Sequence, residues 1–461
     1  MSWQRLGRRE FLWRTGAGVA ALGSAPVWSW ASEQQGPPAP RQQDRGWVGI
    51  PTREHYGDLE ERLEIPPSWD LTVYQMAGAD RPVLTPDEIR QRTESPVAAK
   101  RLADLAQGKR TAIITFDDLT RPTPTFEVLP QLMQELKLGG IRDDGILFLT
   151  SYGSHRPLVQ DEAERKLGGE MVNRYPWLNH NIFENLADIG RTSRGNRIKV
   201  NRHFVQADLR VTISGIKAHV TAGYGGGAKA VLPGVAWIES IDYFHRAIAG
   251  VGANHNKTVG PMKIFHNECR LDMVDAARLA RVDFSVQILY NGRRKVIGLY
   301  AGDIVEAHQA ACREANRLLR TERASNADVV IANGYPQNLQ AAHSLGWARS
   351  CLRDGGTAVL VIQNPQGLQS WHYADERWDY DARPFYETAH PSRWDVKQAG
   401  QLIVYSSYLQ MRDKVAFPAR TVFTRTWAET VAAINKAHRD LARVALYPYA
   451  GIQHPPVDLD G

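Results

Sequence analysis

Short apolar runs alternate with amphipathic stretches along much of the chain. Residues 110–116 and 145–150 are rich in Ala, Ile, Leu and Phe, which predicts buried strands. Residues 126–138 and 160–167 repeat apolar positions at helical spacing, which predicts helices. Because strand, loop and helix alternate, the pattern favours an α/β fold with a mostly parallel sheet.

A second series of the same kind follows a charged segment at residues 320–323. Strands are predicted from residue 328 to a stop at Tyr335-Pro336, over 356–362 and over 401–405, and an amphipathic helix over 427–444 closes the series. We therefore expect two α/β domains with a cleft between them, the larger one N-terminal. The predicted bounds are 47–319 and 320–446, with a tail at 447–461.

The first residues of the chain resemble an export signal. Arg8-Arg9 forms a twin-arginine pattern, an apolar run follows from Thr15 to Val27, and Ser29-Trp30-Ala31 fits a small-x-small cleavage site. The apolar run is too short for a stable membrane anchor. We predict a twin-arginine signal peptide at residues 1–31, recognised by the export machinery, a polar linker at 32–46, and a periplasmic or otherwise exported protein.

The overall composition narrows the class of function. The chain has 461 residues and a net charge of +6, with basic and acidic residues mixed rather than in blocks. Such mixing indicates solubility and attraction of anionic substrates, and it does not form a nucleic-acid footprint. The three cysteines are widely spaced and predict buried thiols, not a disulfide framework or a cysteine-rich metal site.

Polar groups concentrate where the predicted strands end. Asp118 and Arg121 follow the strand at 110–116, and His155 follows the strand at 145–150. A strand predicted over 204–214 leads into a glycine-rich loop that begins at His219. Ligands bind at the carboxyl ends of strands in open α/β sheets, so this edge is the predicted site.

The loop from His219 to Gly234 combines an imidazole, the amine of Lys229 and the small residues Gly225, Gly226 and Gly227. Exposed N–H groups in such a loop can bind phosphate or carboxylate. The loop matches neither the dinucleotide fingerprint nor the phosphate-binding lysine loop. With His245 sixteen residues after Lys229, the combination suggests a metal or an attached cofactor.

Taken together, these motifs resemble the nickel-pincer lactate racemase family. The shared features are Asp-x-x-Arg-Pro from Asp118, His-Arg-Pro from His155, His-x3-Gly-x2-Gly-Gly-x-Lys-x3-Pro-Gly from His219, a histidine at the position of His245, and Gly-Tyr-Pro at 334–336. Their order over much of the chain makes the resemblance specific. It implies a racemase or epimerase of 2-hydroxy acids that uses a nickel-pincer nucleotide.

The resemblance also implies a role for each matched residue. Lys229 would carry the nickel-pincer nucleotide, His245 would bind its nickel, and His155 and His219 would act as paired acid/base groups. Histidine suits that task because its reference pKa, about 6.5, allows both roles near neutrality. Further expected contacts are Arg121 with the substrate carboxylate, Asp118 with Arg121 or the cofactor, and the N–H groups of Gly225, Gly226 and Gly227 with the nucleotide phosphate.

One segment departs from the family pattern. Where lactate racemases have Tyr-Gln-x-x-Lys after Gly-Tyr-Pro, this chain has Leu339-Gln340-Ala341-Ala342-His343. Gln340 and His343 are the expected substrate contacts, and His343 replaces a lysine. We therefore expect a 2-hydroxy acid other than lactate, larger or differently substituted.

Two other classes fit part of the pattern. A hydrolase or lyase could hold a plain divalent metal with His155, His219 and His245, but this leaves Lys229 without a role. A non-enzymatic solute-binding protein could close two lobes on an acid, but this leaves the histidines unexplained. Three further histidines have no motif around them and are expected to be structural: His180, His266 and His372.

Overall fold

The computed structural model describes residues 39–42, 46–250, 255–368, 394–414, 417–438 and 441–459. The predicted signal peptide at 1–31 and His372 lie outside these residues, as does most of the predicted linker at 32–46. None of the helices in the described part of the chain is long and apolar enough to cross a membrane.

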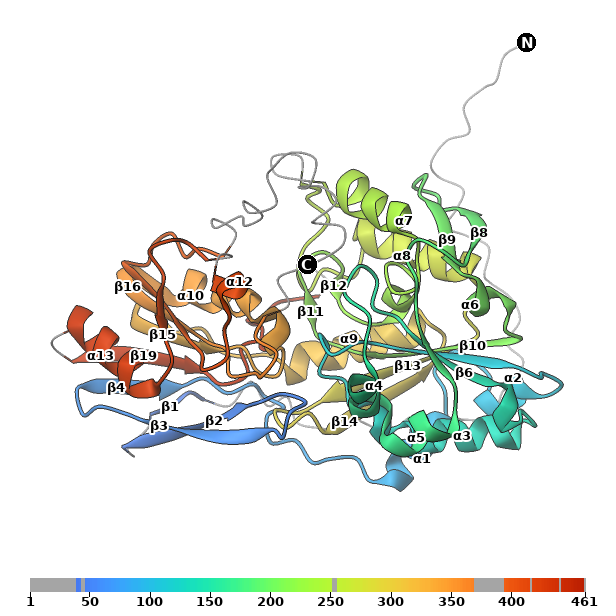
Figure 1. The fold of residues 1–461 in the computed structure, drawn as a ribbon, viewed down its shortest axis with the longest axis horizontal. Coiled ribbons are helices and arrows are strands. Elements are labelled where there is room, and N and C mark those ends of the chain that lie inside the picture. Colours follow the sequence, from blue (N-terminus) through green and yellow to red (C-terminus); the bar gives the residue numbers. More distant parts are fainter. Residues whose placement is uncertain are drawn as a thin grey trace, which may run out of the picture. The chain divides into compact units, whose positions relative to one another are not determined.

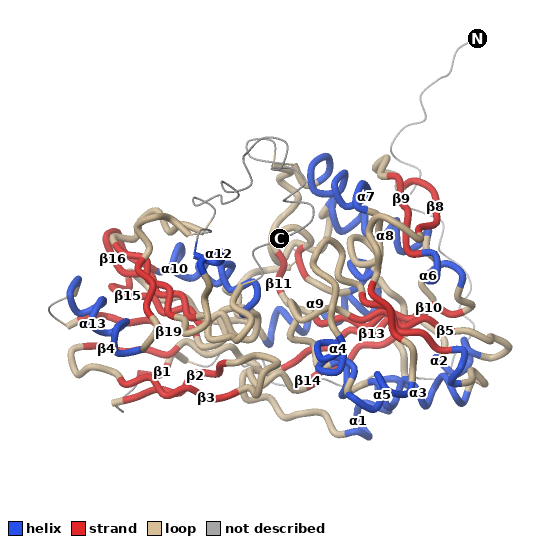
Figure 2. Tube along the Cα trace, in the orientation of Figure 1, coloured by secondary structure: helices blue, strands red, loops and turns tan. Residues whose placement is uncertain are grey.

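The first of two large sheets has six strands, and all but one neighbouring pair are parallel. All five residues of its strand β5 are buried, as expected for a parallel strand covered on both faces. Figure 2 shows β5, β10 and β13 running together. In spatial order the strands are β14 (Val296–Gly302), β13 (Phe284–Tyr290), β10 (Leu209–Gly215), β5 (Ala112–Phe116), β6 (Ile146–Thr150) and β7 (Trp177–Asn179).

The helices associated with this sheet lie before, between and after its strands in the chain, and they contribute to its core. α3 buries Leu129, Leu132, Met133 and Leu136 in the same cluster as the strands. β13 and β14 form an antiparallel hairpin that turns at Asn291-Gly292. The helices are α1 (Pro86–Glu94), α2 (Leu102–Ala106), α3 (Leu129–Leu138), α4 (Gln160–Leu167), α5 (Gly169–Arg174), α6 (Arg202–Gln206), α7 (Ile238–Tyr243), α8 (Glu268–Leu279) and α9 (Glu306–Leu318).

The second large sheet has seven strands and joins segments from both ends of the chain. In Figure 1 the blue strand β4 lies beside the red strand β19, and their register pairs Trp69 with Ala442 and Val73 with Leu446. α10 (Leu345–Cys351), α12 (Met411–Lys414) and α13 (Trp427–Ala437) accompany it. The strand order is β1 (Arg41–Gln42), β4 (Trp69–Val73), β19 (Ala442–Tyr447), β15 (Ala327–Asn333), β16 (Leu352–Val361), β17 (Gln401–Tyr405) and β18 (Val422–Thr424).

Small antiparallel pairs complete the described structure. β2 (Trp47–Thr52) pairs with β3 (Leu59–Glu64), and β8 (Leu186–Arg191) pairs with β9 (Arg197–Asn201). β11 (Ala218–His219) pairs with β12 (Gly223–Tyr224) at the start of the glycine-rich loop. Residues 36–461 form one compact unit that contains both large sheets.

The α/β class is confirmed, but three details of the prediction are wrong. Residues 202–206 form α6, capped by the Asn201 side chain, so the strand begins only at Leu209. The closing helix ends at Ala437, and Ala442–Tyr447 is an inner strand of the second sheet. The division at residue 319 does not follow the sheets, because β4 joins the C-terminal strands.

Candidate active site

Three neighbouring strands of the first sheet end at one pocket. β5 leads to Asp118 and Arg121, β6 leads to His155, and β10 leads to His219. Because the three strands are parallel and adjacent, their carboxyl ends meet at the same edge. The structure therefore brings together nine of the predicted site residues in the pocket lining: Asp118, Arg121, His155, His219, Gly226, Lys229, His245, Gln340 and His343.

His155 is oriented by a buried carboxylate. Its Nδ1 lies 2.7 Å from Oδ2 of Asp118, while the Thr120 hydroxyl donates to Oδ1 of the same carboxylate at 2.5 Å. Burial opposes ionisation of Asp118, but the neighbouring His155 and Arg121 lower its pKa below the usual range. Asp118 was expected to orient Arg121 or the cofactor; its hydrogen bonds instead hold His155 and Thr120.

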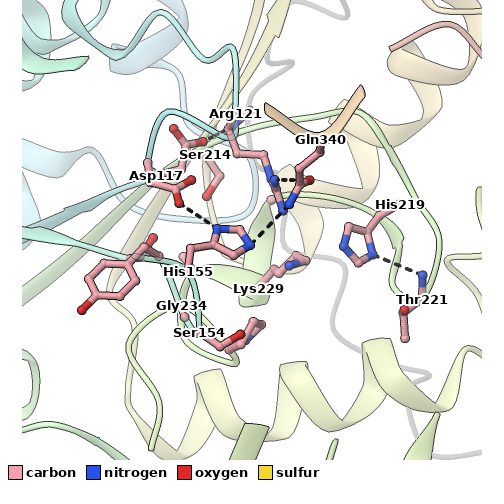
Figure 3. A pocket seen from close by; sticks show the side chains of 18 of the residues that line it. Asp117, Arg121, Ser154, His155, Ser214, His219, Thr221, Lys229, Gly234 and Gln340 are labelled. Carbon is pink, nitrogen blue, oxygen red and sulfur yellow. Dashed lines mark hydrogen bonds and ion pairs between the residues drawn. The ribbon is translucent and has the colours of Figure 1, made fainter. Parts of the chain in front are cut away.

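Arg121 forms a hydrogen bond with Gln340, a residue of the C-terminal part of the chain that carries the second sheet. Its Nη1 donates to Oε1 of Gln340 at 3.0 Å and to the Thr120 hydroxyl at 2.9 Å. Gln340 belongs to a 3₁₀ segment, Asn338–Ser344 (η6), which also carries His343. Figure 3 shows Arg121, Gln340 and His155 grouped in the pocket and joined by dashed lines. A guanidinium in this position can bind a carboxylate through two donors.

His219 opens the glycine-rich loop and is held by that loop's backbone. Its Nδ1 accepts hydrogen bonds from the backbone N–H groups of Thr221 and Ala222, each at 3.2 Å. Burial lowers the pKa of His219 well below its ordinary value, and the nearby Lys229 and Arg121 lower it further. A neutral imidazole is therefore favoured at this position.

Lys229 presents a buried amine to the same pocket. Burial is the main cause of a pKa well below the ordinary lysine value, with the charges of Arg121 and Arg270 acting in the same direction. Burial thus favours the neutral amine, which is the nucleophilic form, over the ammonium ion. The residue thus fits the chemistry of a covalent linkage to a cofactor.

His245 lies in a π-helical turn, Phe244–Ile248 (η4), that continues α7. Its Nδ1 lies 2.8 Å from the carbonyl oxygen of Ile241, so Nδ1 carries the proton and donates. The lone pair is then on Nε2, the nitrogen that can coordinate a metal. A π-turn is a frequent feature of functional sites, because it re-aims one side chain within a helix.

The glycine-rich loop differs from the predicted phosphate cradle. The N–H of Gly225 donates to the carbonyl of Lys217 at 2.8 Å, and that of Gly227 donates to the Gln287 side chain at 2.8 Å. Only Gly226 of the three lines the pocket. The expectation that all three N–H groups face a phosphate is therefore wrong for Gly225 and Gly227, because interior acceptors occupy them.

These glycines are required by close packing behind the loop. A Cβ at Gly227 would lie 2.6 Å from the His308 ring, and one at Gly226 would lie 2.5 Å from the Ile216 side chain. The buried guanidinium of Arg270 also donates to the carbonyls of Ala222, Tyr224 and Gly226. The loop is thus fixed from the protein side while Lys229 faces the pocket.

Several residues that support the site were not identified from the sequence. Thr120, Lys217 and Gln337 are nearly fully buried, and Lys217 donates to Oε1 of Gln337. Thr120 lies within the Asp118–Pro122 motif, and Gln337 directly follows the Gly-Tyr-Pro motif at 334–336. Neither motif predicts that these side chains are buried hydrogen-bond partners of the site. His180 is structural as predicted, since its Nε2 contacts the carbonyl of Ala236 at 2.9 Å.

The other simple expectations have mixed outcomes. Cys269, Cys312 and Cys351 are buried free thiols, as predicted. In the described residues no group of three or more His, Cys, Asp and Glu side chains is arranged to hold a metal ion. The three-histidine ligand set of the hydrolase alternative is therefore not assembled there.

The chain is similar to lactate racemases. A family model described as the lactate racemase N-terminal domain matches residues 56–257. A lactate racemase of Lactiplantibacillus plantarum is 30% identical over 382 residues, which are 78% of this chain and 89% of that protein. A lactate racemase of Thermoanaerobacterium thermosaccharolyticum is 29% identical over 294 residues, 61% of this chain and 66% of that protein.

Solved structures share the fold. The lactate racemase apoprotein from Thermoanaerobacterium thermosaccharolyticum superposes with a TM-score of 0.66 at 21% identity, covering 88% of this chain and 99% of that one. A crystal structure of a protein from Thermotoga maritima gives a TM-score of 0.56 at 19% identity, covering 82% and 98%. With the length and identity of the Lactiplantibacillus match, the chain belongs to the lactate racemase family, a family of racemase-type isomerases.

Proposed function

We propose that the protein is an exported racemase or epimerase of 2-hydroxy acids that uses a nickel-pincer nucleotide. The observation that carries the proposal is the convergence, in one pocket, of a buried amine, a histidine suited to bind a metal, two further imidazoles and a guanidinium. The family resemblance gives each of these groups a use.

Lys229 and His245 are the residues assigned to the cofactor. The amine of Lys229 fits a covalent linkage because burial favours its uncharged form. The lone pair on Nε2 of His245 fits a nickel ligand, and imidazole suits that metal. When bound, the pincer nucleotide supplies a hydride acceptor for the α-hydrogen of the substrate.

The remaining groups are assigned to the substrate. Arg121 is the anchor for the carboxylate of a 2-hydroxy acid, with Gln340 beside it at 3.0 Å. His155 and His219 are assigned to the substrate hydroxyl, because both line the pocket with a ring nitrogen fixed from behind.

The proposed substrate is not lactate itself. His343 stands where the family pattern has a lysine, and its side chain lies at the exposed end of the pocket lining. An imidazole is shorter than a lysine side chain and titrates near neutrality. A 2-hydroxy acid with a longer or more polar substituent would fill the space beside His343 and could form a hydrogen bond with its imidazole.

The proposal is tested with holoprotein made in cells that synthesise the pincer nucleotide. A panel of 2-hydroxy acids is followed by chiral chromatography, and we expect interconversion of at least one pair of stereoisomers. Lys229→Ala should abolish this activity. If Lys229→Ala protein interconverts the same acid at the wild-type rate, the assignment is wrong; if it still binds the acid and wild type is inactive, a solute-binding protein is supported.

Export is proposed from the twin-arginine pattern at Arg8-Arg9. Replacement of both arginines by lysine should retain the protein in the cytoplasm, as measured by fractionation and immunoblotting. Equal amounts of wild type and variant outside the cytoplasm would contradict the proposed route.

A further inference from the structure

Thr120 is buried at the junction between Arg121 and the pair formed by Asp118 and His155. Only 1% of its surface is exposed, and it is not among the residues that line the pocket. Its hydroxyl oxygen lies 2.9 Å from Nη1 of Arg121, 2.5 Å from Oδ1 of Asp118 and 3.2 Å from Nδ1 of His155. One oxygen atom thus contacts three of the side chains that form the site.

The partners of this hydroxyl fix where its proton lies. A guanidinium can only donate, so the Thr120 oxygen accepts a hydrogen bond from Arg121. Burial raises the pKa of Asp118, but His155, Arg121 and the Thr120 hydroxyl together lower it below its usual range. An ionised carboxylate can only accept, so the single hydroxyl proton is donated to Oδ1 of Asp118. The hydroxyl therefore accepts from one charged group and donates to the other.

The two oxygen atoms of Asp118 have separate partners. Oδ1 accepts from the hydroxyl of Thr120 and from its backbone N–H, the latter at 3.2 Å, while Oδ2 lies 2.7 Å from Nδ1 of His155. Rotation of the carboxylate about its Cβ–Cγ bond moves both oxygens together. The Thr120 hydroxyl therefore helps to set the plane in which the other oxygen meets the His155 ring.

Arg121 is restrained by the same residue. Its Nη1 donates to the hydroxyl of Thr120 at 2.9 Å, to the backbone carbonyl of Thr120 at 3.1 Å and to Oε1 of Gln340 at 3.0 Å. The guanidinium is planar and rigid, so fixing one of its nitrogens orients the whole group. Two of these three contacts come from Thr120.

The local chain places the hydroxyl at this junction. The backbone N–H of Arg121 donates to the carbonyl of Asp118 at 3.1 Å, which closes a turn over residues 118–121. The bond from the N–H of Thr120 to the Asp118 side chain is the kind that aspartate commonly makes two residues further on. Among side chains of this size, only those of serine and threonine carry a hydroxyl that accepts and donates through one atom.

From these contacts we infer that Thr120 is a positioning residue that couples Arg121 to Asp118 and His155. Its hydroxyl holds the proposed carboxylate anchor and an imidazole assigned to the substrate hydroxyl in one relative orientation. A 2-hydroxy acid requires this, because its carboxyl and hydroxyl groups are on adjacent carbon atoms and must be bound together. The kinetic consequence rests on the proposed function, whereas the arrangement of the side chains does not.

The first test is a set of crystal structures of the apoprotein. Thr120→Val keeps the β-branched shape and removes the hydroxyl, whereas Thr120→Ser keeps the hydroxyl. We expect the Asp118 carboxylate to rotate and the Arg121 guanidinium to move in Thr120→Val, and both to keep their wild-type positions in Thr120→Ser. Unchanged positions of Asp118, Arg121 and His155 in Thr120→Val would overturn the inference.

A second pair of variants and a control account for effects on folding. If Thr120→Val does not fold, Thr120→Ala is compared with Thr120→Ser, because these two differ only by the hydroxyl oxygen. Thr93→Val is the matched control, since Thr93 is also 1% exposed and its hydroxyl donates to the carbonyl of Ile89 within α1, away from the pocket lining. This control removes a buried hydroxyl and should leave the side chains of the site in place.

Turnover of the holoprotein measures the consequence for the reaction. Hydrogen bonds to charged groups are stronger than neutral ones, so Thr120→Val should reduce kcat/KM by about 10- to 150-fold. Thr120→Ser should stay within about threefold of wild type, and Thr93→Val should have wild-type kinetics. If Thr120→Val has the same kinetics as Thr93→Val, the inference is overturned.

A double-mutant cycle shows whether Thr120 acts through Asp118. In an Asp118→Ala background the acceptor of the hydroxyl proton is gone, so Thr120→Val should cost about threefold or less there. The same loss in both backgrounds would mean that the two residues act independently, contrary to the inference. If wild type interconverts no 2-hydroxy acid while the apoprotein structures change as expected, the proposed function fails and the positioning role stands.

Discussion

The two large sheets contribute unequally to the pocket. The six-stranded sheet delivers Asp118, Arg121, His155 and His219 from the carboxyl ends of three adjacent strands. Among the described residues, the part of the chain that carries the seven-stranded sheet reaches the pocket lining only through η6, with Gln340 and His343. Under the proposed function, the first sheet would supply the reaction chemistry and the cofactor attachment, and the second sheet's part of the molecule would adjust substrate binding.

This division explains where the chain departs from the family pattern. The motifs at Asp118, His155 and His219 are intact, whereas the changed positions Leu339 and His343 lie in η6. Substitution in η6 leaves the strand-end groups in place, because only the hydrogen bonds of Gln337 and Gln340 link η6 to the loop at Thr120 and Arg121. A shared mechanism with a different substrate is the expected result.

The largest effect is predicted for the anchor on the first sheet. Arg121→Ala should reduce kcat/KM by about 30-fold to several thousand-fold, because losing one partner of a charged, hydrogen-bonded pair costs about 2–5 kcal/mol. Arg142→Ala, at an exposed loop, is the matched control and should have wild-type kinetics. A loss smaller than threefold for Arg121→Ala would show that the substrate carboxylate binds elsewhere.

A smaller effect is predicted for the corresponding position of η6. Gln340→Ala removes hydrogen bonds to Arg121 and His155, each worth about 0.5–1.5 kcal/mol, so kcat/KM should fall by about 5- to 150-fold. Gln398→Ala, which contacts only the backbone of α10, serves as the control. If Gln340→Ala lost as much kcat/KM as Arg121→Ala, the first sheet and η6 would contribute equally to catalysis, contrary to the account.

His343→Lys should change selectivity more than rate. Restoring the family lysine adds a longer, permanently charged group at the exposed end of the pocket, so the ratio of kcat/KM for lactate to that for the best substrate should rise by about tenfold. The ratio is measured on both acids with the same enzyme preparation. An unchanged ratio would place selectivity outside η6.

The smallest effect on turnover is predicted at the support of η6. Glu54 is fully buried, and its Oε2 accepts from the backbone N–H of Asn338 at 2.8 Å. Desolvation raises the pKa of Glu54 to about 8, against the opposing effect of Arg294. Because the folded pKa is above the unfolded value, this group's contribution to stability is complete in acid and is lost as pH rises through about 8.

Glu54→Gln should therefore leave activity near the wild-type level and flatten the fall in stability between about pH 4.5 and pH 8, since the amide does not ionise. Thermal unfolding at several pH values measures this difference. If wild type and variant lose Tm in parallel, the alkaline loss has another source.

Elements that depend on the local pattern of apolar residues were predicted from the sequence. Elements that depend on pairing with distant segments of the chain were not. Strands β5, β6 and β17 were predicted because apolar runs between turn residues identify them. Residues 442–446 continue the amphipathic pattern of α13, and only pairing with β4 and β15 makes them a strand. The partners of the glycine N–H groups, Lys217 and Gln287, are likewise set by tertiary structure.

The site shows the same limit. Asp118, Arg121, His155 and His219 follow strands, so their meeting at one edge could be predicted from the parallel topology. Their hydrogen-bond directions could not, because these depend on Thr120, Gln337 and the backbone of Thr221, which no motif spacing specifies.

The most direct test of the account is the intact mass and nickel content of protein purified from cells that make the pincer nucleotide. We predict an adduct whose mass maps to the peptide containing Lys229, with bound nickel, and loss of the adduct in Lys229→Ala. His245→Ala should keep the adduct and lose nickel. Active wild-type protein that is unmodified and free of nickel would contradict the account.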